Sequence, residues 1–394
     1  MKQYMDFDIQ RNLFVILIMV AVLTVGIAFA LKTQYFSAPK VAAIVESQAN
    51  ESPQTILPLP PPPPQKLTNP PEIIKAVYVT GYSASSKYYL NYLSQLFKNT
   101  EINAVVLDIK GSDGKMELYD ADNVVRFLHN QNIYVIGRIA VFEDPTYSKA
   151  RPELAIYDKL KSAGSPEGVP SGSRRVLWLD NNGLSWMDPS SKDVWDYNIS
   201  LAKDAFSNHG FDEVNFDYAR FPTDGNAKNM GFPVYDEKTP ISEVIKNFFQ
   251  YVRANLAGEK ISVDLFGLTT VNSDDMGIGQ IIENAFENFD YISPMVYPSH
   301  YANGFIGFVN PAQHPYEVIK YSLDSAVVKQ KAIPLFTSKL RPWLQDFNMG
   351  AEYNADMVKQ EIKATQDSLQ NEYNGFMLWN PSNVYTQEAV LRPN

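Results

Sequence analysis

Acidic residues at the ends of short apolar runs are the residues of this 394-residue chain that are best suited to chemistry. Four of them share this position: Asp108, Glu143, Asp217 and Asp264. A carboxylate that is buried beside a strand costs free energy unless it is paired or functional. Cleavage of a glycosidic bond uses two such groups, one to protonate the leaving oxygen and one to attack or to activate water.

Basic and aromatic residues accompany these acids. Arg138 and Arg220 lie in the same runs, so buried ion pairs are an alternative role for the acids. Aromatic rings at or just past the ends of the runs can stack on sugars or pack in the core: Tyr82, Tyr218, Phe266, Tyr297, Tyr301, Trp343 and Trp379. The predicted substrate-binding residues are Asp108, Arg138, Glu143, Arg220, Tyr297 and Trp379.

The composition and the spacing of residues argue against several other chemistries. The chain has no cysteine, which excludes disulfides, zinc–thiolate sites, iron–sulfur clusters and a thiol nucleophile. Its four histidines lack metal-binding spacing, and neither a Gly-x-Ser-x-Gly elbow nor a P-loop is present. We therefore expect no cofactor and no metal. A net charge of −10 argues against nucleic acid as a partner, because phosphate binding requires basic surfaces.

Eight apolar, β-branched and aromatic runs must position these residues, and they alternate with helical patterns as in a parallel α/β fold. The predicted strands are 76–82, 104–109, 133–139, 213–220, 261–267, 291–297, 332–337 and 375–380. This number of strands predicts a (β/α)8 barrel, a TIM barrel, over residues 73–394. A doubly wound nucleotide-binding sheet is the alternative, but no glycine-rich fingerprint follows the first run.

One connection of the predicted barrel is much longer than the others. Residues 142–188, between the third and fourth runs, exceed what a βα unit of roughly 30 residues requires. A connection that follows a barrel strand lies on the face formed by the carboxyl ends of the strands, where active sites of this fold are built. We therefore predict an insertion beside the active site.

A membrane anchor is predicted near the N-terminus. Residues 13–31 contain no charge, and at 1.5 Å per residue a helix of this length spans roughly 28 Å, which matches a bilayer core. Cleavage as a signal peptide near Ala30 is the alternative, although a signal core is usually shorter. We place residues 1–12 in the cytoplasm, the anchor in the cell membrane as a single pass, and the rest of the chain outside.

A proline-rich linker follows the anchor over residues 32–72. Its run of consecutive prolines, 60–64, favours a stiff polyproline II segment. We interpret this linker as a spacer between the membrane and the domain at 73–394, with docking to a proline-binding module as the alternative.

Motifs within residues 73–394 resemble a family of bacterial (β/α)8 proteins assigned as glycoside hydrolases, with distant similarity to α-amylase-type barrels. The motifs are VVLDIKG, YVIGRIAVFEDP, WMDPSSKDVWDYNISLAKDAFSNHGFDEVNFDYARFPTDG, which contains the FDYxRFP element, and YISPMVYPSHY. The resemblance implies that Asp217, at the end of the fourth strand, is the nucleophile. It places a Glu acid/base on the fifth strand, where this chain has Asp264, and an Arg at position 215, where it has Asn.

These observations predict a membrane-anchored, extracytoplasmic glycoside hydrolase that acts on a polysaccharide or oligosaccharide. Asp217 is the predicted nucleophile or base and Asp264 the predicted general acid, with Glu143 as the next candidate. The lipid bilayer is the second expected partner, through residues 13–31. A non-catalytic glycan-binding barrel of the cell envelope is the alternative function.

Overall fold

The computed structural model describes residues 62–162, 175–334 and 336–392. The predicted tail, anchor and most of the linker (1–12, 13–31 and 32–61) lie outside these residues. Across the described ranges no helix is long and apolar enough to cross a membrane.

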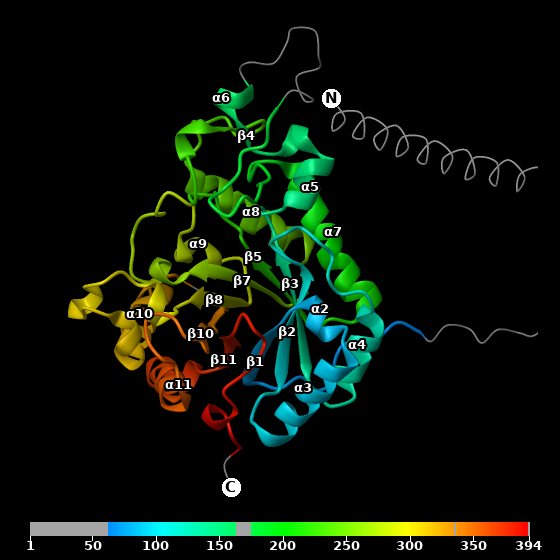
Figure 1. Ribbon diagram of the computed structural model, residues 1–394, viewed down its shortest axis with the longest axis vertical. Helices are drawn as coiled ribbons and strands as arrows, with labels where there is room; N and C mark the ends of the chain where they lie inside the picture. The colour runs from blue at the N-terminus through cyan, green and yellow to red at the C-terminus, as the bar shows by residue number, and fades with distance from the viewer. Residues whose placement is uncertain (1–61, 163–174, 335, 393–394) are drawn as a thin grey trace, which may run out of the picture. The chain divides into compact units, whose positions relative to one another are not determined.

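Parallel strands form a closed barrel, which confirms the predicted (β/α)8 fold (Figure 1). The strands are β1 (Ile74–Val79), β2 (Ala104–Lys110), β3 (Tyr134–Ala140), β5 (Glu213–Asp217), β7 (Ile261–Phe266), β8 (Tyr291–Met295), β9 (Lys339–Leu340), β10 (Trp343–Gln345) and β11 (Gly375–Trp379). β9 pairs with β8, and β10 pairs with both β11 and β8, so β9 and β10 share the seventh position and close the barrel.

The predicted seventh strand, 332–337, is wrong. Ala332 caps helix α10 (Pro315–Lys331), and Pro334 has no N–H to donate to a sheet. The strand lies further along the chain, in two short pieces interrupted by Pro342. The other seven predicted strands correspond to barrel strands, with ends that differ by a few residues.

Helices surround the barrel in the described part of the chain (Figure 1). They are α2 (Gly81–Ala84), α3 (Lys87–Asn99), α4 (Ala121–His129), α5 (Pro145–Ala150), α6 (Lys159–Ser162), α7 (Lys192–His209), α8 (Ile241–Asn255), α9 (Ile282–Phe286), α10 and α11 (Ala355–Leu369). In α8 the buried residues recur at helical spacing, so one apolar face packs on the barrel: Val244, Ile245, Phe248, Phe249 and Val252.

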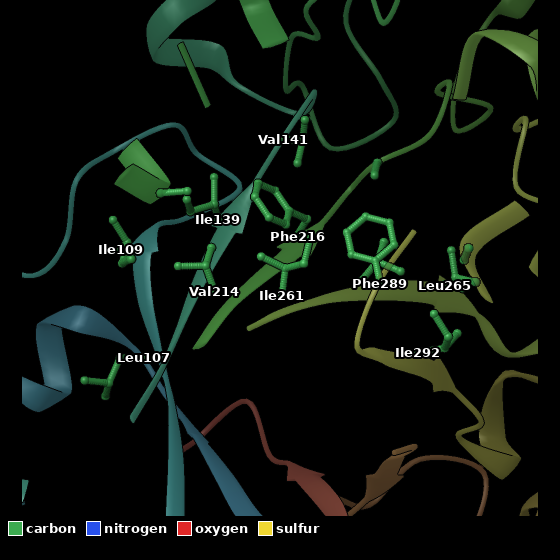
Figure 2. Close-up of a cluster of buried hydrophobic side chains, with 14 of the residues drawn as sticks. Leu107, Ile109, Ile139, Val141, Val214, Phe216, Ile261, Leu265, Phe289 and Ile292 are labelled. Carbon is green, nitrogen blue, oxygen red and sulfur yellow. The ribbon is translucent and has the colours of Figure 1, made fainter. Parts of the chain in front are cut away.

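Alternation along β5 separates an apolar exterior from a polar interior. Val214 and Phe216 of β5 point toward the helices and belong to the cluster of buried apolar side chains in Figure 2. The residues between them, Glu213, Asn215 and Asp217, hydrogen-bond to side chains of other strands within the barrel. Because side chains alternate with a period of two, the apolar packing of one face fixes which polar residues enter the barrel.

The predicted insertion, 142–188, follows β3 and therefore lies on the carboxyl-end side of the strands. It contains α5, β4 (Tyr157–Asp158) and α6, with residues 163–174 outside the described part. β4 pairs antiparallel with β6 (Met230–Gly231), which belongs to the connection after β5. Two long connections thus join beside the open end of the barrel.

Residues 62–67, which we call the N-terminal strap, lie against the amino ends of the strands. Arg126 of α4 donates a hydrogen bond to the Pro62 carbonyl, and the Leu67 N–H donates to Asp212, just before β5, at 2.6 Å. Pro64 is buried against Gly210, where an added Cβ would meet the Pro64 carbonyl oxygen at 2.5 Å. Gly210 has a φ of 67°, so glycine suits both its conformation and this close approach.

Asp212 should stabilise the fold through the strap. Its carboxylate also accepts hydrogen bonds from the Val135 N–H at 2.8 Å and from His129 at 2.9 Å. We expect Asp212→Ala to lower the free energy of unfolding by about 2–4 kcal/mol, because two backbone donors lose a charged acceptor. Asp324→Ala is the control, since Asp324 forms an exposed pair with Lys320 and should change stability by about 0.5 kcal/mol or less. Equal urea denaturation midpoints for the two variants would contradict this role.

Candidate active site

A cavity of about 420 Å³ opens at the carboxyl ends of the barrel strands. This volume is in the range of small-molecule and sugar sites. Six of the eight predicted site residues line it: Arg138, Asp217, Arg220, Asp264, Tyr297 and Trp379. The other two, Asp108 and Glu143, are not among its lining residues. The barrel therefore brings side chains from β3, β5, β7 and later strands to one place, as parallel strands of a barrel must.

Arg138 holds Asp217 in a fixed position. The guanidinium Nη2 and Nε atoms donate to Asp217 Oδ2 at 2.6 and 3.0 Å. The N–H of Tyr218 donates to Asp217 Oδ1 at 2.6 Å. Three donor atoms thus bind the carboxylate, two of them on the positively charged guanidinium group of Arg138.

Asp108 lies behind Arg138 and is almost completely buried, with 3% of its surface exposed. Its Oδ1 accepts a hydrogen bond from Arg138 Nη1 at 2.6 Å, and its Oδ2 accepts one from the Tyr78 hydroxyl. Burial raises the pKa of Asp108, and the charge of Arg138 opposes this rise. Asp108 therefore orients Arg138, while its predicted contact with substrate stays a prediction.

Asp264 shares the cavity with Asp217 but has no cation of its own. Its Oδ1 accepts hydrogen bonds from Trp343 Nε1 at 2.7 Å and from Asn215 Nδ2 at 2.8 Å. Burial raises the pKa of Asp264 well above the usual range, and the nearby charge of Asp217 adds to the rise. The two neighbouring carboxyl groups thus differ in their surroundings, because Asp217 pairs with Arg138 whereas Asp264 accepts only from neutral donors. Different surroundings allow two carboxyl groups in one site to act as base and acid. Asn215, where the resemblance predicts arginine, orients Asp264.

Glu143 follows β3 and is the third acidic group of the region. Burial, with the charge of Asp180, raises its pKa to about 8, although Arg220 opposes this. In the described part of the chain its carboxyl group has no hydrogen-bond partner. Arg220, whose charge opposes this rise, has its guanidinium carbon 4.7 Å from the ring centroid of Trp186 and 4.8 Å from that of Phe266. Glu143 is therefore protonated at neutral pH and able to donate a proton.

Aromatic side chains form one side of the cavity. The rings of Tyr297, His300, Phe347 and Trp379, which we call the aromatic wall, contact one another. Sequence reasoning identified Tyr297 and Trp379. It missed Phe347, which packs against these rings but is not among the lining residues, because the seventh strand was misplaced. It took His300 as a surface-loop residue, and His300 is exposed and also lines the cavity. Of the other predicted aromatic residues, Tyr218, Phe266, Tyr301 and Trp343 line the cavity, whereas Tyr82 is exposed.

Tyr218 has an unusual backbone conformation beside Asp217, with a φ of 53°. A bulky residue in the left-handed region costs about 1–3 kcal/mol and persists where the surroundings fix it. Here that conformation accompanies the hydrogen bond from the Tyr218 N–H to Asp217. Burial and the charge of Asp217 raise the pKa of the Tyr218 phenol to about 12.

The described residues contain no group of three or more His, Asp or Glu side chains arranged to hold a metal ion. The carboxyl groups in the cavity, which lie beside Arg138 and the aromatic wall, can act as acid, base or nucleophile.

Residues 76–385 match the family described as "Putative glycosyl hydrolase domain". The chain belongs to this family. This match agrees with the resemblance found in the sequence, and the protein carries a glycosyl hydrolase domain. No curated protein matches the chain.

Solved structures with a similar fold include the glycoside hydrolase domain of PgaB (BpsB) from Bordetella bronchiseptica. It is 13% identical, with a TM-score of 0.55, and the match covers 82% of this chain and 100% of that one. A hypothetical protein from Ruminiclostridium thermocellum is 36% identical over 48% of this chain and 96% of its own, with a TM-score of 0.40. At 13% identity, the first of these matches supports the barrel fold alone.

The raised pKa of Glu143 predicts a pH-dependent effect on stability. In the unfolded chain Glu143 ionises near pH 4.5, whereas in the folded protein it keeps its proton up to about pH 8. Its contribution to the free energy of unfolding therefore falls as the pH rises between these values. We expect the stability of Glu143→Gln relative to the wild type to increase from pH 5 to pH 8 in urea denaturation. A constant difference would show that Glu143 is ionised in the folded protein.

Proposed function

We propose that the protein is a membrane-anchored, extracytoplasmic glycoside hydrolase that cleaves a polysaccharide by a two-carboxylate mechanism. The observation that carries this proposal is the cavity shared by Asp217 and Asp264. Asp217 pairs with the guanidinium group of Arg138, and the pKa of Asp264 is raised well above the usual range, which favours its protonated form. A glycosidase needs one carboxylate and one carboxylic acid on either side of the bond it cleaves.

In the proposed reaction, Asp264 donates its proton to the glycosidic oxygen as the bond from that oxygen to the anomeric carbon breaks. Asp217 attacks the anomeric carbon, or removes a proton from a water molecule that attacks it. In the first case, water later cleaves the glycosyl–Asp217 bond and returns a proton to Asp264. Arg138 keeps Asp217 oriented throughout, because Asp108 holds its guanidinium from the other side.

Glu143 is the second candidate for the general acid. Its pKa of about 8 leaves it protonated at neutral pH. It does not line the cavity, however, whereas Asp264 does. This difference favours Asp264 as the general acid. Arg220, which lines the cavity, is assigned to binding the substrate, and the same role of Glu143 stays a prediction.

The aromatic wall supports a glycan as the substrate. Ring faces of tryptophan and tyrosine offer apolar surface with a polar edge, which suits a sugar ring. Tyr297, just after β8, and Trp379, at the end of β11, lie 5.6 Å apart between ring centroids, and both line the cavity. We assign the substrate to the polysaccharides of the cell envelope or to an exopolysaccharide.

Membrane anchoring rests on the apolar residues 13–31, and the extracytoplasmic location follows from the short N-terminal tail. An enzyme held in this way would act on glycans outside the cytoplasmic membrane. Secretion after cleavage near Ala30 leads to the same substrates without the attachment.

Asp217→Asn should abolish turnover. The amide is neither a nucleophile nor a base, so we expect the rate of reducing-end release by the full-length protein to fall by about 10²–10⁴-fold or more. Asp324→Asn, which alters an exposed carboxylate on α10, is the matched control and should leave the rate unchanged. The screen uses bacterial and plant polysaccharides, and thermal denaturation verifies that each variant is folded.

The same experiment distinguishes a hydrolase from a glycan-binding barrel. In a hydrolase, Asp217→Asn retains most of its affinity for the polysaccharide that the wild type cleaves. If the wild type binds a polysaccharide but releases no reducing ends from it, and Asp217→Asn behaves identically, the non-catalytic function is favoured.

Two arginines in the apolar segment should release the chain from the membrane. Val20→Arg with Leu23→Arg costs roughly 2.5–3.5 kcal/mol per arginine at the centre of a transmembrane helix. We expect this variant to move from the membrane pellet to the soluble fraction, whereas the apolar swap Val20→Leu with Leu23→Val should stay in the pellet. Mass spectrometry of the mature N-terminus separates a retained anchor from cleavage near Ala30. An unchanged distribution of the arginine variant would refute anchoring by residues 13–31.

A further inference from the structure

His300 is a cavity residue to which the proposed mechanism gives no role. It ends a short 3-10 helix (Pro298–His300) after β8, and its ring lines the cavity. The ring lies 5.2 Å from Tyr297 and 6.2 Å from Phe347, between centroids, so it belongs to the aromatic wall. Its Nδ1 atom is 3.1 Å from the Ser299 hydroxyl. Its Nε2 atom has no hydrogen-bond partner among the described residues.

Gln345 fixes the hydrogen bonding around His300. Gln345 is completely buried, and its Oε1 accepts hydrogen bonds from the Ser299 N–H at 3.2 Å and from the Ser299 hydroxyl at 2.8 Å. Its Nε2 donates to the Phe347 carbonyl at 2.9 Å. If the oxygen and nitrogen of the Gln345 amide were exchanged, the NH2 group would face the Ser299 N–H, which is also a donor. The amide oxygen would then face the Phe347 carbonyl oxygen, which is also an acceptor. The orientation of this amide is therefore determined.

The tautomer of His300 follows from this orientation. A serine hydroxyl has a single hydrogen, and the Ser299 hydroxyl donates it to Gln345. The contact between Ser299 and His300 Nδ1 is therefore a hydrogen bond only if Nδ1 carries the proton. Burial lowers the pKa of His300, which favours the neutral ring. In a neutral imidazole with a protonated Nδ1, Nε2 has a free lone pair and accepts hydrogen bonds.

We propose that His300 is a substrate-binding residue whose Nε2 atom accepts a hydrogen bond from a hydroxyl or amide N–H group of a sugar that contacts the aromatic wall. Ser299 and Gln345 are positioning residues that keep Nε2 unprotonated. This assignment rests on the proposed glycoside hydrolase function and adds a specificity element to it. A binding site that offers an acceptor disfavours sugars in which the matching donor is absent or substituted.

Gln345, unlike Ser299, acts from a separate part of the barrel. Gln345 ends β10, and its backbone N–H donates to Glu361 of α11 at 2.8 Å. This hydrogen bond anchors the backbone of Gln345 to α11, which restrains the position of the side chain that binds Ser299. His300 therefore obtains its tautomer from scaffold contacts that exist before a sugar binds.

The tautomer can be measured without any activity assay. In ¹⁵N NMR of histidine-labelled full-length protein, His300→Gln identifies the signals of His300 among the four histidines. At neutral pH we expect a protonated Nδ1 and an unprotonated Nε2. Ser299→Ala should shift the signals toward the other tautomer, because Nδ1 loses its acceptor. A protonated Nε2 in the wild type, or signals that Ser299→Ala leaves unchanged, would overturn the assignment.

Sugar binding tests the second half of the proposal. The probes are maltopentaose, cellopentaose and chitopentaose, added to the Asp217→Asn protein so that they are not cleaved. For a pentasaccharide that binds, we expect the Nε2 signal of His300 to move, and His300→Phe to weaken the affinity by about 3–10-fold, the loss typical of one hydrogen bond. His300→Gln, which can offer an acceptor oxygen, should recover part of the affinity.

His314→Gln is the control for these measurements. His314 is stacked on Phe308 at 3.8 Å and does not line the cavity, so its replacement should leave binding unchanged. Binding that leaves the Nε2 signal of His300 unmoved, or that His300→Phe does not weaken, would overturn the contact with sugar. These results are separate from the hydrolase proposal, which fails if Asp217→Asn retains the turnover of the wild type.

Discussion

The interior of the barrel depends on one cation, the guanidinium group of Arg138, placed between Asp108 and Asp217. Without it, two nearly buried carboxylates would face each other with no compensating charge, which is one of the most destabilising arrangements in a protein core. With it, the carboxylate of Asp217 has a directly bonded counter-charge at the cavity. The same cation explains the contrast with Asp264, which has only neutral donors within hydrogen-bond distance and whose pKa is raised well above the usual range. The difference between the two carboxyl groups is therefore produced by the position of a single side chain on β3.

A second buried ion pair lies nearer to the amino ends of the strands. Glu213, at the start of β5, pairs with Arg341, and it also accepts hydrogen bonds from Ser262 and Tyr134. One strand thus contributes an acid to each polar layer, because Glu213 and Asp217 share the inward face of β5. The lower layer is fully buried and closes the barrel, whereas the upper layer meets the cavity. In the lower layer the arginine–carboxylate pair of Arg341 and Glu213 supports the fold, whereas in the upper layer the pair of Arg138 and Asp217 orients a carboxylate that faces the cavity.

Much of this arrangement could be predicted from the sequence, and the predictions that were wrong or missing have identifiable physical reasons. β-branched and aromatic runs located seven of the eight barrel positions, and acids at their ends marked the cavity. The run at 332–337 has the composition of a strand but follows directly on α10 and contains Pro334, so the true strand and Phe347 behind it were missed. The sequence left catalysis and ion pairing as competing roles for Asp217. These roles are compatible, because the pair with Arg138 is what keeps the carboxylate charged. The tautomer of His300 depends on Gln345, 46 residues away from Ser299, and no local pattern reveals such a contact.

The position of the N-terminal strap determines which end of the barrel is suited to attachment. Its residues contact Arg126, Gly210 and Asp212, all at the amino ends of the strands, while the cavity lies at the carboxyl ends. Residues 62–67 therefore lie at the end of the barrel opposite the cavity, and a long polymer chain can approach the cavity without meeting them. Immobilising the protein on a solid support ahead of Pro62 should accordingly present the open end to the solution.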